Sequence, residues 1–120
     1  MDVLKVFGQL DNERGRRNEE RALDAVTTAN LSWIRSARLA TREEDARGID
    51  LVLETDVGGL FFQIKSSHRG KRKFIDTHGK SRTRIAVIVL QHLLTEKLFQ
   101  TRILEAVHSE RKAILDLRGC

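Results

Sequence analysis

Apolar residues recur at helical spacing near both ends of the chain. Between about Asp11 and Asn30 an apolar stripe lies opposite an arginine-rich face, which predicts an amphipathic helix that ends at Asn30. Leu93 to about Ser109 carries a second apolar stripe and predicts another helix packed on a core. The following residues, Lys112–Leu117, fit either an extension of this helix or a short edge strand.

Three stretches between these helices have the composition of β-strands. Leu31–Ala40 alternates loosely, and Ile49–Ser66 contains two apolar runs around a Gly-Gly pair, which predicts a strand followed by a hairpin. The continuous apolar run Arg84–Leu90 predicts a central strand that is buried on both faces. Residues 41–48 read as a charged turn, and residues 68–80 as a basic loop with room for one helical turn.

This succession of elements predicts a single domain over residues 1–120, of the α/β (α+β) class. A mixed sheet of about four strands with helices packed against it is the expected architecture. With 120 residues, of which 40% are hydrophobic, the chain is long enough to bury a core.

The predicted hairpin gathers three polar residues on one face. A two-residue loop at positions 57–58 or 58–59 sets the register, and either register places Asp50, Gln63 and Lys65 on the same side of the sheet. The carboxylate of Asp50 and the amide oxygen of Gln63 are hard ligands that suit Mg²⁺ or Mn²⁺. The backbone carbonyl of Ile64 is a further candidate ligand. Lys65 lies about 6.6 Å along the strand from Gln63, where its ammonium can assist a metal-activated water.

A single carboxylate holds Mg²⁺ poorly, so a second acid is expected. Positions three, four and seven residues after Glu19 are all apolar, which places Glu19 on the inward face of the first helix, with Glu20 as the alternative. Glu54 shares the face of Asp50 but lies roughly 13 Å along the strand, too far to bind the same ion. Asp45 precedes the hairpin and is expected in the outer shell of the site.

This set of residues resembles the PD-(D/E)xK nuclease superfamily, which has the restriction-endonuclease-like fold. The resemblance joins Glu19, the motif G-I-D at 48–50, and Q-I-K-S-S at 63–67, and it extends over about residues 11–110. It is closest to Holliday-junction-resolvase-type and homing-endonuclease-type members. The family has an αβββαβ core around one or two Mg²⁺ ions. No proline precedes Asp50, and Gln63 replaces the usual acid, as in the Q-x-K form of some active members.

The resemblance assigns a role to each of these residues. Asp50 becomes the central metal ligand, Gln63 a second ligand, Lys65 the catalytic lysine and Glu19 the helix acid. The implied activity is that of an Mg²⁺-dependent endonuclease that hydrolyses DNA through a metal-activated water, with Mn²⁺ as a substitute ion. Cutting both strands of a duplex would require a homodimer, and the predicted amphipathic helix near the C-terminus is a candidate interface.

Charge and cysteine content agree with this interpretation. The net charge of +5 and a pI near 9.9 favour a polyanionic partner such as DNA. Residues expected to contact DNA follow the hairpin: Ser66, Ser67, Arg69, Lys71, Arg72, Lys73 and Lys80. The single cysteine, Cys120, and the absence of a signal-like N-terminal stretch predict a cytoplasmic protein. No apolar run approaches the ~20 residues of a membrane span.

Two other hypotheses remain open at this stage. The neutral side chain of Gln63 is compatible with a nucleic-acid-binding module that keeps the fold but is catalytically inactive. The basic charge is also compatible with a structural or partner-binding protein for which charge is incidental.

Overall fold

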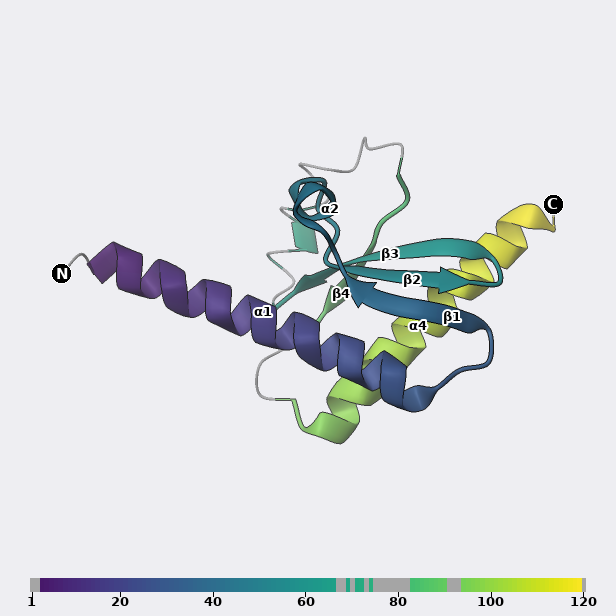
Figure 1. Ribbon diagram of the computed structural model, residues 1–120, viewed down its shortest axis with the longest axis horizontal. Helices are drawn as coiled ribbons and strands as arrows, with labels where there is room; N and C mark the ends of the chain where they lie inside the picture. Colours follow the sequence, from purple (N-terminus) through teal and green to yellow (C-terminus); the bar gives the residue numbers. More distant parts are fainter. Residues whose placement is uncertain are drawn as a thin grey trace.

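The computed structural model describes residues 3–66, 69, 71, 72, 74, 83–90 and 94–119, with side chains from residue 16 onward. It is an α+β protein with a four-stranded mixed sheet flanked by helices, in agreement with the predicted class (Figure 1). The elements are α1 (Val3–Ala29), β1 (Ile34–Leu39), α2 (Arg42–Ala46), β2 (Leu51–Thr55), β3 (Gly58–Lys65), β4 (Ala86–Val89) and α4 (Glu96–Arg118).

The sheet has the strand order β1-β2-β3-β4. The first three strands are antiparallel neighbours, whereas β4 runs parallel to β3. A parallel neighbour requires a crossover connection, and residues 69, 71, 72 and 74 of this connection are helical. Because β4 is the last strand in this order, it is an edge strand of the described sheet. The prediction of a central position for Arg84–Leu90 is therefore wrong. Its apolar composition reflects contact with the core, where Ile88 and Leu90 are buried.

Helices α1 and α4 cover one face of the sheet and form the core with it. Leu51, Leu53, Leu60 and Phe62 are at most 1% exposed, and they pack against residues of α1 and α4. The buried positions of the helices are Ala22, Ala25 and Val26 on α1, and Phe99, Ile103 and Val107 on α4. Burial of such a set is the main force that holds the elements together.

The helix boundaries agree with the predicted end at Asn30 and differ at the start of α1 and in the charged stretch before the hairpin. α1 begins at Val3 and thus extends well before Asp11, and in Figure 1 its N-terminal half projects away from the sheet. α1 ends at Ala29, and Asn30 follows with a left-handed φ of 49°, a conformation that asparagine tolerates. α4 continues to Arg118, so the alternative of an edge strand at Lys112–Leu117 is wrong. The charged stretch before the hairpin contains the short helix α2.

The hairpin turn lies one or two residues earlier than predicted. Thr55 pairs with Gly58, so the loop is Asp56-Val57. The hydroxyl of Thr55 accepts a hydrogen bond from the N–H of Val57 (3.1 Å) and donates one to the carbonyl of Gly58 (2.8 Å). Gly58 has a φ of 99°, which a residue with a side chain rarely adopts. The observed pairing of the two strands is offset from the predicted one by an even number of residues. Side chains at regularly paired positions therefore lie on the predicted face of the sheet.

Among the described residues, no helix is long and apolar enough to cross a membrane.

Candidate metal centre

Glu19 is placed by the packing of α1 on the sheet. Ala22 and Val26 on the same stripe are 0% and 2% exposed, and Glu19 precedes them by one turn, where it is half-buried. Glu20 points outward and lies 3.7 Å from Arg16 in an exposed ion pair. The structure therefore directs Glu19, and not Glu20, toward the sheet.

Asp50 lies where the regular β2–β3 ladder ends. The ladder pairs Leu51 with Phe62, and its continuation would pair Asp50 with Gln63. Instead, the N–H of Asp50 donates to the carbonyl of Phe62 (2.8 Å), and the N–H of Ile64 donates to Oδ2 of Asp50 (2.8 Å). Asp50 is only 6% exposed. The N–H of Ile64 thus holds its carboxylate in a fixed position beside β3.

Three carboxylates from three different elements meet at this point. Ligand oxygens of Glu19 on α1, Asp45 on α2 and Asp50 before β2 all lie within 4.8 Å of one another. We call these three residues the acidic cluster. Asp45 is exposed, Glu19 half-buried and Asp50 buried, so the cluster opens to solvent on the side of α2.

The proximity of these carboxyl groups changes their protonation. Burial and then the neighbouring charge of Asp50 raise the pKa of Glu19 from 4.5 to about 7. Burial also raises the pKa of Asp50, although the N–H of Ile64 and a hydrogen bond from Glu19 oppose this rise. Below about pH 7 Glu19 is therefore protonated and can donate a hydrogen bond to Asp50.

The position of Asp45 depends on the local structure of α2. Thr41 caps the helix: its side chain accepts from the N–H of Glu44 (3.2 Å), and the carboxylate of Glu44 accepts from the N–H of Thr41 (2.8 Å). Two hydrogen bonds from Arg38 on β1 to Glu44 (2.6 and 2.9 Å) then attach the helix to the sheet. The hydrogen bonds from Arg38 hold the pKa of Glu44 at about 2.

Gln63 and Lys65 follow Asp50 on the neighbouring strand. Gln63 is 7% exposed, and its Oε1 atom has no hydrogen-bond donor among the described residues. A buried amide oxygen without a donor is costly, and a bound cation would satisfy it. Nζ of Lys65 lies 5.7 Å from the ring centroid of Phe74. Burial raises the pKa of Asp50, and the positive charge of Lys65 opposes this rise.

The backbone of Ile64 also faces the acidic cluster. The N–H and C=O of a residue in an antiparallel strand point toward the same neighbouring strand. Because the N–H of Ile64 donates to Asp50, its carbonyl points to the same side. The Ile64 carbonyl therefore remains a candidate ligand.

The residues predicted to contact DNA are only partly within the described chain. Ser66, Arg69 and Arg72 are exposed, and Lys71 is partly buried. Ser67, Lys73 and Lys80 lie outside the described residues.

Asp45, expected in the outer shell of the site, lies with a carboxylate oxygen within 4.8 Å of those of Glu19 and Asp50. The signal that could have located it is the capping box T-R-E-E at 41–44, which predicts a helix start at Thr41. A helix there turns Asp45 toward the strand entrance, whereas a turn leaves its direction undefined.

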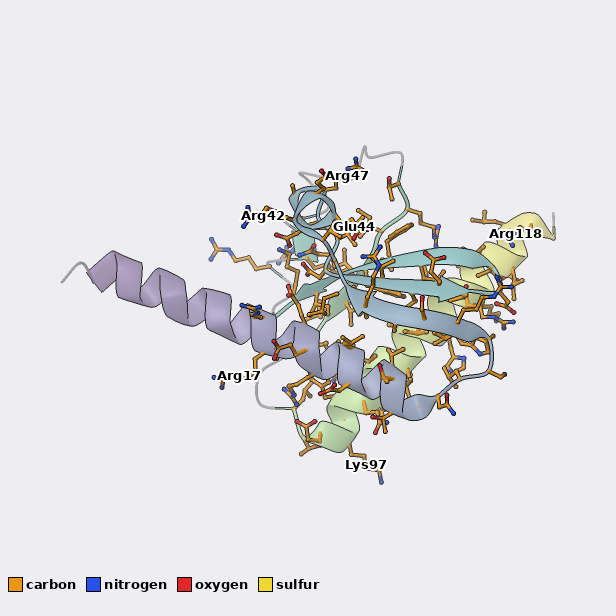
Figure 2. The ribbon with its side chains drawn as sticks, viewed as in Figure 1. Arg17, Arg42, Glu44, Arg47, Lys97 and Arg118 are labelled. Atoms are coloured by element: carbon orange, nitrogen blue, oxygen red, sulfur yellow. The ribbon has the colours of Figure 1, made fainter. Side chains whose placement is uncertain are left out.

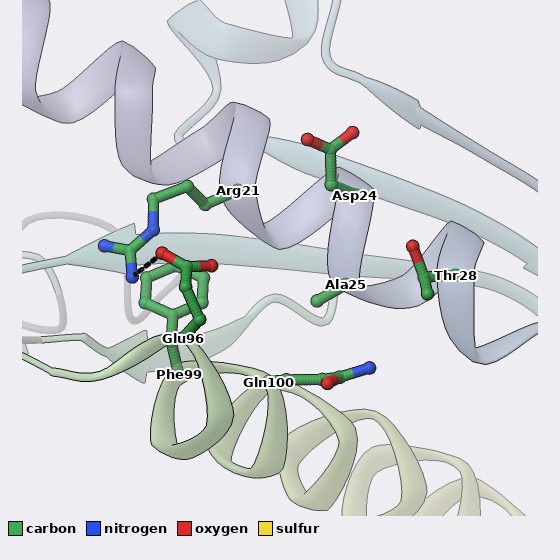
Figure 3. A pocket seen from close by; sticks show the side chains of 7 residues that line it. All are labelled: Arg21, Asp24, Ala25, Thr28, Glu96, Phe99 and Gln100. Carbon is green, nitrogen blue, oxygen red and sulfur yellow. Dashed lines mark ion pairs between the residues drawn. The ribbon is translucent and has the colours of Figure 1, made fainter.

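Two hollows on the surface lie apart from the acidic cluster. One, of about 160 Å³, lies between α1 and α4, and Figure 3 shows Arg21 at its edge paired with Glu96. The guanidinium of Arg21 also stacks 3.9 Å from the ring centroid of Phe99, so its charge already has two partners. The other, of about 300 Å³, lies along the C-terminal end of α1 and β1. The first is lined by two carboxylates, Asp24 and Glu96, of which Glu96 is paired with Arg21, and the second is lined by none.

Comparison with family models, curated proteins and solved structures found no match to this chain. Its function must therefore be argued from the chemistry of the acidic cluster.

Proposed function

We propose that the protein is a divalent-cation-dependent endonuclease that acts on DNA, with a site of the PD-(D/E)xK type in its Q-x-K form. The observation that carries the proposal is the meeting of Glu19, Asp45 and Asp50 within 4.8 Å. The buried Oε1 of Gln63, which has no donor among the described residues, supports it, because Gln63 precedes Ile64, whose N–H binds Asp50. The four residues come from α1, α2, the entrance to β2, and β3. No stabilising role in the fold requires like charges to be gathered in this way.

The donor set fits Mg²⁺ or Mn²⁺. Carboxylate, amide and backbone carbonyl oxygens are the ligands that these hard cations prefer, and in the part of the chain that the structure describes no sulfur or imidazole ligand joins the cluster. Asp50, Glu19 and Asp45 would hold the ion, with Gln63 and the Ile64 carbonyl as neutral ligands. When bound, such a cation acidifies a coordinated water and offsets the negative charge of a phosphodiester.

The protein groups around the cation have distinct tasks. The N–H of Ile64 fixes the carboxylate of Asp50, so this ligand needs no reorganisation when the cation arrives. Below about pH 7, where Glu19 is protonated, a cation that used this carboxylate as a ligand would have to displace its proton to solvent. Lys65 offers an ammonium beside the same carboxylate, where it can orient the nucleophile and stabilise charge that develops on the phosphate.

A plasmid-nicking assay tests the proposal. In Mg²⁺ or Mn²⁺ we expect the wild type to nick supercoiled DNA, and Asp50→Ala and Lys65→Ala to be at least about 100-fold slower, because each removes a group that acts on the reacting atoms. Lys97→Ala on α4 removes an exposed cation far from the cluster and is the matched control (Figure 2). Equal cleavage by all four proteins would refute the proposal.

The neutral Gln63 favours a second candidate, a nucleic-acid-binding module without catalysis. An amide contributes less to cation binding than a carboxylate, since it lacks the charge. This candidate predicts DNA binding without cleavage and no measurable Mg²⁺ affinity by calorimetry.

Cleavage of both strands of a duplex would require two sites, so we propose a homodimer for that activity. Phe99, Ile103 and Val107 of α4 are buried in the core of the same chain, so only its exposed apolar residues are available to a second copy. These are Leu98, Leu115 and Leu117, and with them α4 stays a candidate interface. Light scattering that reports a monomer under cleavage conditions would restrict the activity to nicking.

A further inference from the structure

Helix α2 presents two arginines next to the acidic cluster. Arg42 is its first residue, and Arg47 follows its last turn; both are exposed. Figure 2 shows both side chains at the surface around α2, away from the core. Asp45, on the same short helix, belongs to the acidic cluster.

The spacing places Arg42 beside the cluster. Residues three apart on a helix are neighbours on one side, with Cβ atoms about 5–6 Å apart. Arg42 is therefore a neighbour of Asp45, the member of the acidic cluster on α2. Even so, neither Arg42 nor Arg47 forms an ion pair with any described carboxylate, although Glu43, Glu44 and Asp45 are close in sequence.

The other charges of α2 already have partners or positions of their own. Glu44 is bound by Arg38, and this bidentate contact fixes the helix on the sheet. Asp45 joins Glu19 and Asp50. Arg42 and Arg47 thus remain available to a ligand, on an element that is well anchored to the sheet. Guanidinium groups match the geometry of phosphate well.

We propose that α2 is a phosphate-binding rim of this site: Arg42 contacts a phosphate next to the one at the acidic cluster, and Arg47 contacts another along the strand. The inference rests on the proposed nuclease function and specifies its substrate as an extended nucleic acid strand. These contacts position the backbone and carry no base information, so they act equally on all sequences. The two arginines would add α2 to the proposed DNA-binding surface, which in the sequence-based prediction is limited to the basic segment after β3.

Salt-dependent DNA binding in EDTA tests the rim without requiring catalysis. Fluorescence anisotropy with a labelled duplex gives the slope of log affinity against log salt, whose magnitude is about 0.9 for each phosphate that the protein neutralises. We expect Arg42→Ala to reduce this magnitude by about 0.9 and the double variant Arg42→Ala/Arg47→Ala by about 1.8. Arg42→Lys keeps the charge and should keep most of the slope, and Lys97→Ala should retain the wild-type slope.

The outcomes separate the rim from the nuclease activity. If the Arg42 and Arg47 variants keep the wild-type slope, the proposal that α2 binds phosphate is overturned. If cleavage still depends on Asp50 in that case, the proposed nuclease function stands. Reduced slopes in proteins that never cleave DNA would support the rim and refute the nuclease. An equal slope change in Lys97→Ala would show diffuse charge attraction and would also overturn the rim. Circular dichroism melts establish that each variant is folded.

Discussion

At the scale of single residues, the site depends on a departure from regular structure at Asp50. A regular ladder would turn this side chain fully onto one face of the sheet, beside Gln63. The observed hydrogen bonds to Phe62 and from Ile64 leave the carboxylate where Glu19 and Asp45 can reach it. The cost is a gathering of negative charge, which protonation of Glu19 relieves below about pH 7.

This proton makes the stability of the cation-free protein depend on pH. The folded-state pKa of Glu19, about 7, lies above its ordinary value of 4.5, so its contribution to stability is complete below pH 4.5 and is lost as the pH rises through 7. Glu19→Gln stays neutral at all pH values. In EDTA we expect the wild type to lose thermal stability relative to Glu19→Gln between about pH 5 and pH 8. A constant difference between the two melting temperatures over this range would contradict the assigned pKa.

At the scale of elements, α2 determines whether Asp45 takes part. The helix has only five residues, so its capping interactions are a large part of its stability. The first helix, the hairpin and the last helix were predictable because their periodicity is strong. Apolar periodicity does not reveal α2, because its residues are charged, and only the capping box at Thr41 marks its start. The position of β4 depends on pairings that no local pattern encodes.

Two threonine caps provide a matched test of α2. Thr41 caps α2 and Thr95 caps α4, each through a hydrogen bond that its hydroxyl oxygen accepts from a backbone N–H. Either threonine-to-alanine change should cost about 0.5–2 kcal/mol locally. We expect Thr41→Ala to lower Mn²⁺ affinity about tenfold or more, as removal of the groups that support a ligand does at metal sites. Thr95→Ala should lower global stability and leave Mn²⁺ affinity unchanged in calorimetry.

If both variants bound Mn²⁺ as tightly as the wild type, α2 would not position a ligand.

At the scale of the whole molecule, the acidic cluster joins parts that are distant in the chain. Glu19 and Asp50 are separated by β1 and α2, and they meet because α1 and the hairpin share one core. The sequence located Asp50 and Gln63 on neighbouring segments of one hairpin, because the turn was predicted to within two residues of its observed position. It could not indicate how Asp45 approaches them, because that depends on the packing of α2 against β1.

Because the cluster exists only in the folded chain, a cation should stabilise the whole fold. A ligand that binds only the folded state adds about 2.7 kcal/mol at a concentration about 100 times its dissociation constant. Differential scanning fluorimetry should therefore show a higher melting temperature for the wild type in Mn²⁺ than in EDTA. Asp50→Ala should show no such increase, and an equal increase in both proteins would place the ion elsewhere.

The most direct measurement is anomalous X-ray scattering from crystals soaked in Mn²⁺ at about pH 8, where Glu19 is ionised. The account predicts a manganese peak within ligand distance of an Asp50 oxygen and of at least one oxygen from Glu19, Asp45 or Gln63. Crystals of Asp50→Ala, soaked in the same way, should lack this peak. Wild-type crystals with no peak at the acidic cluster in millimolar Mn²⁺, or with manganese only at other positions, would contradict it.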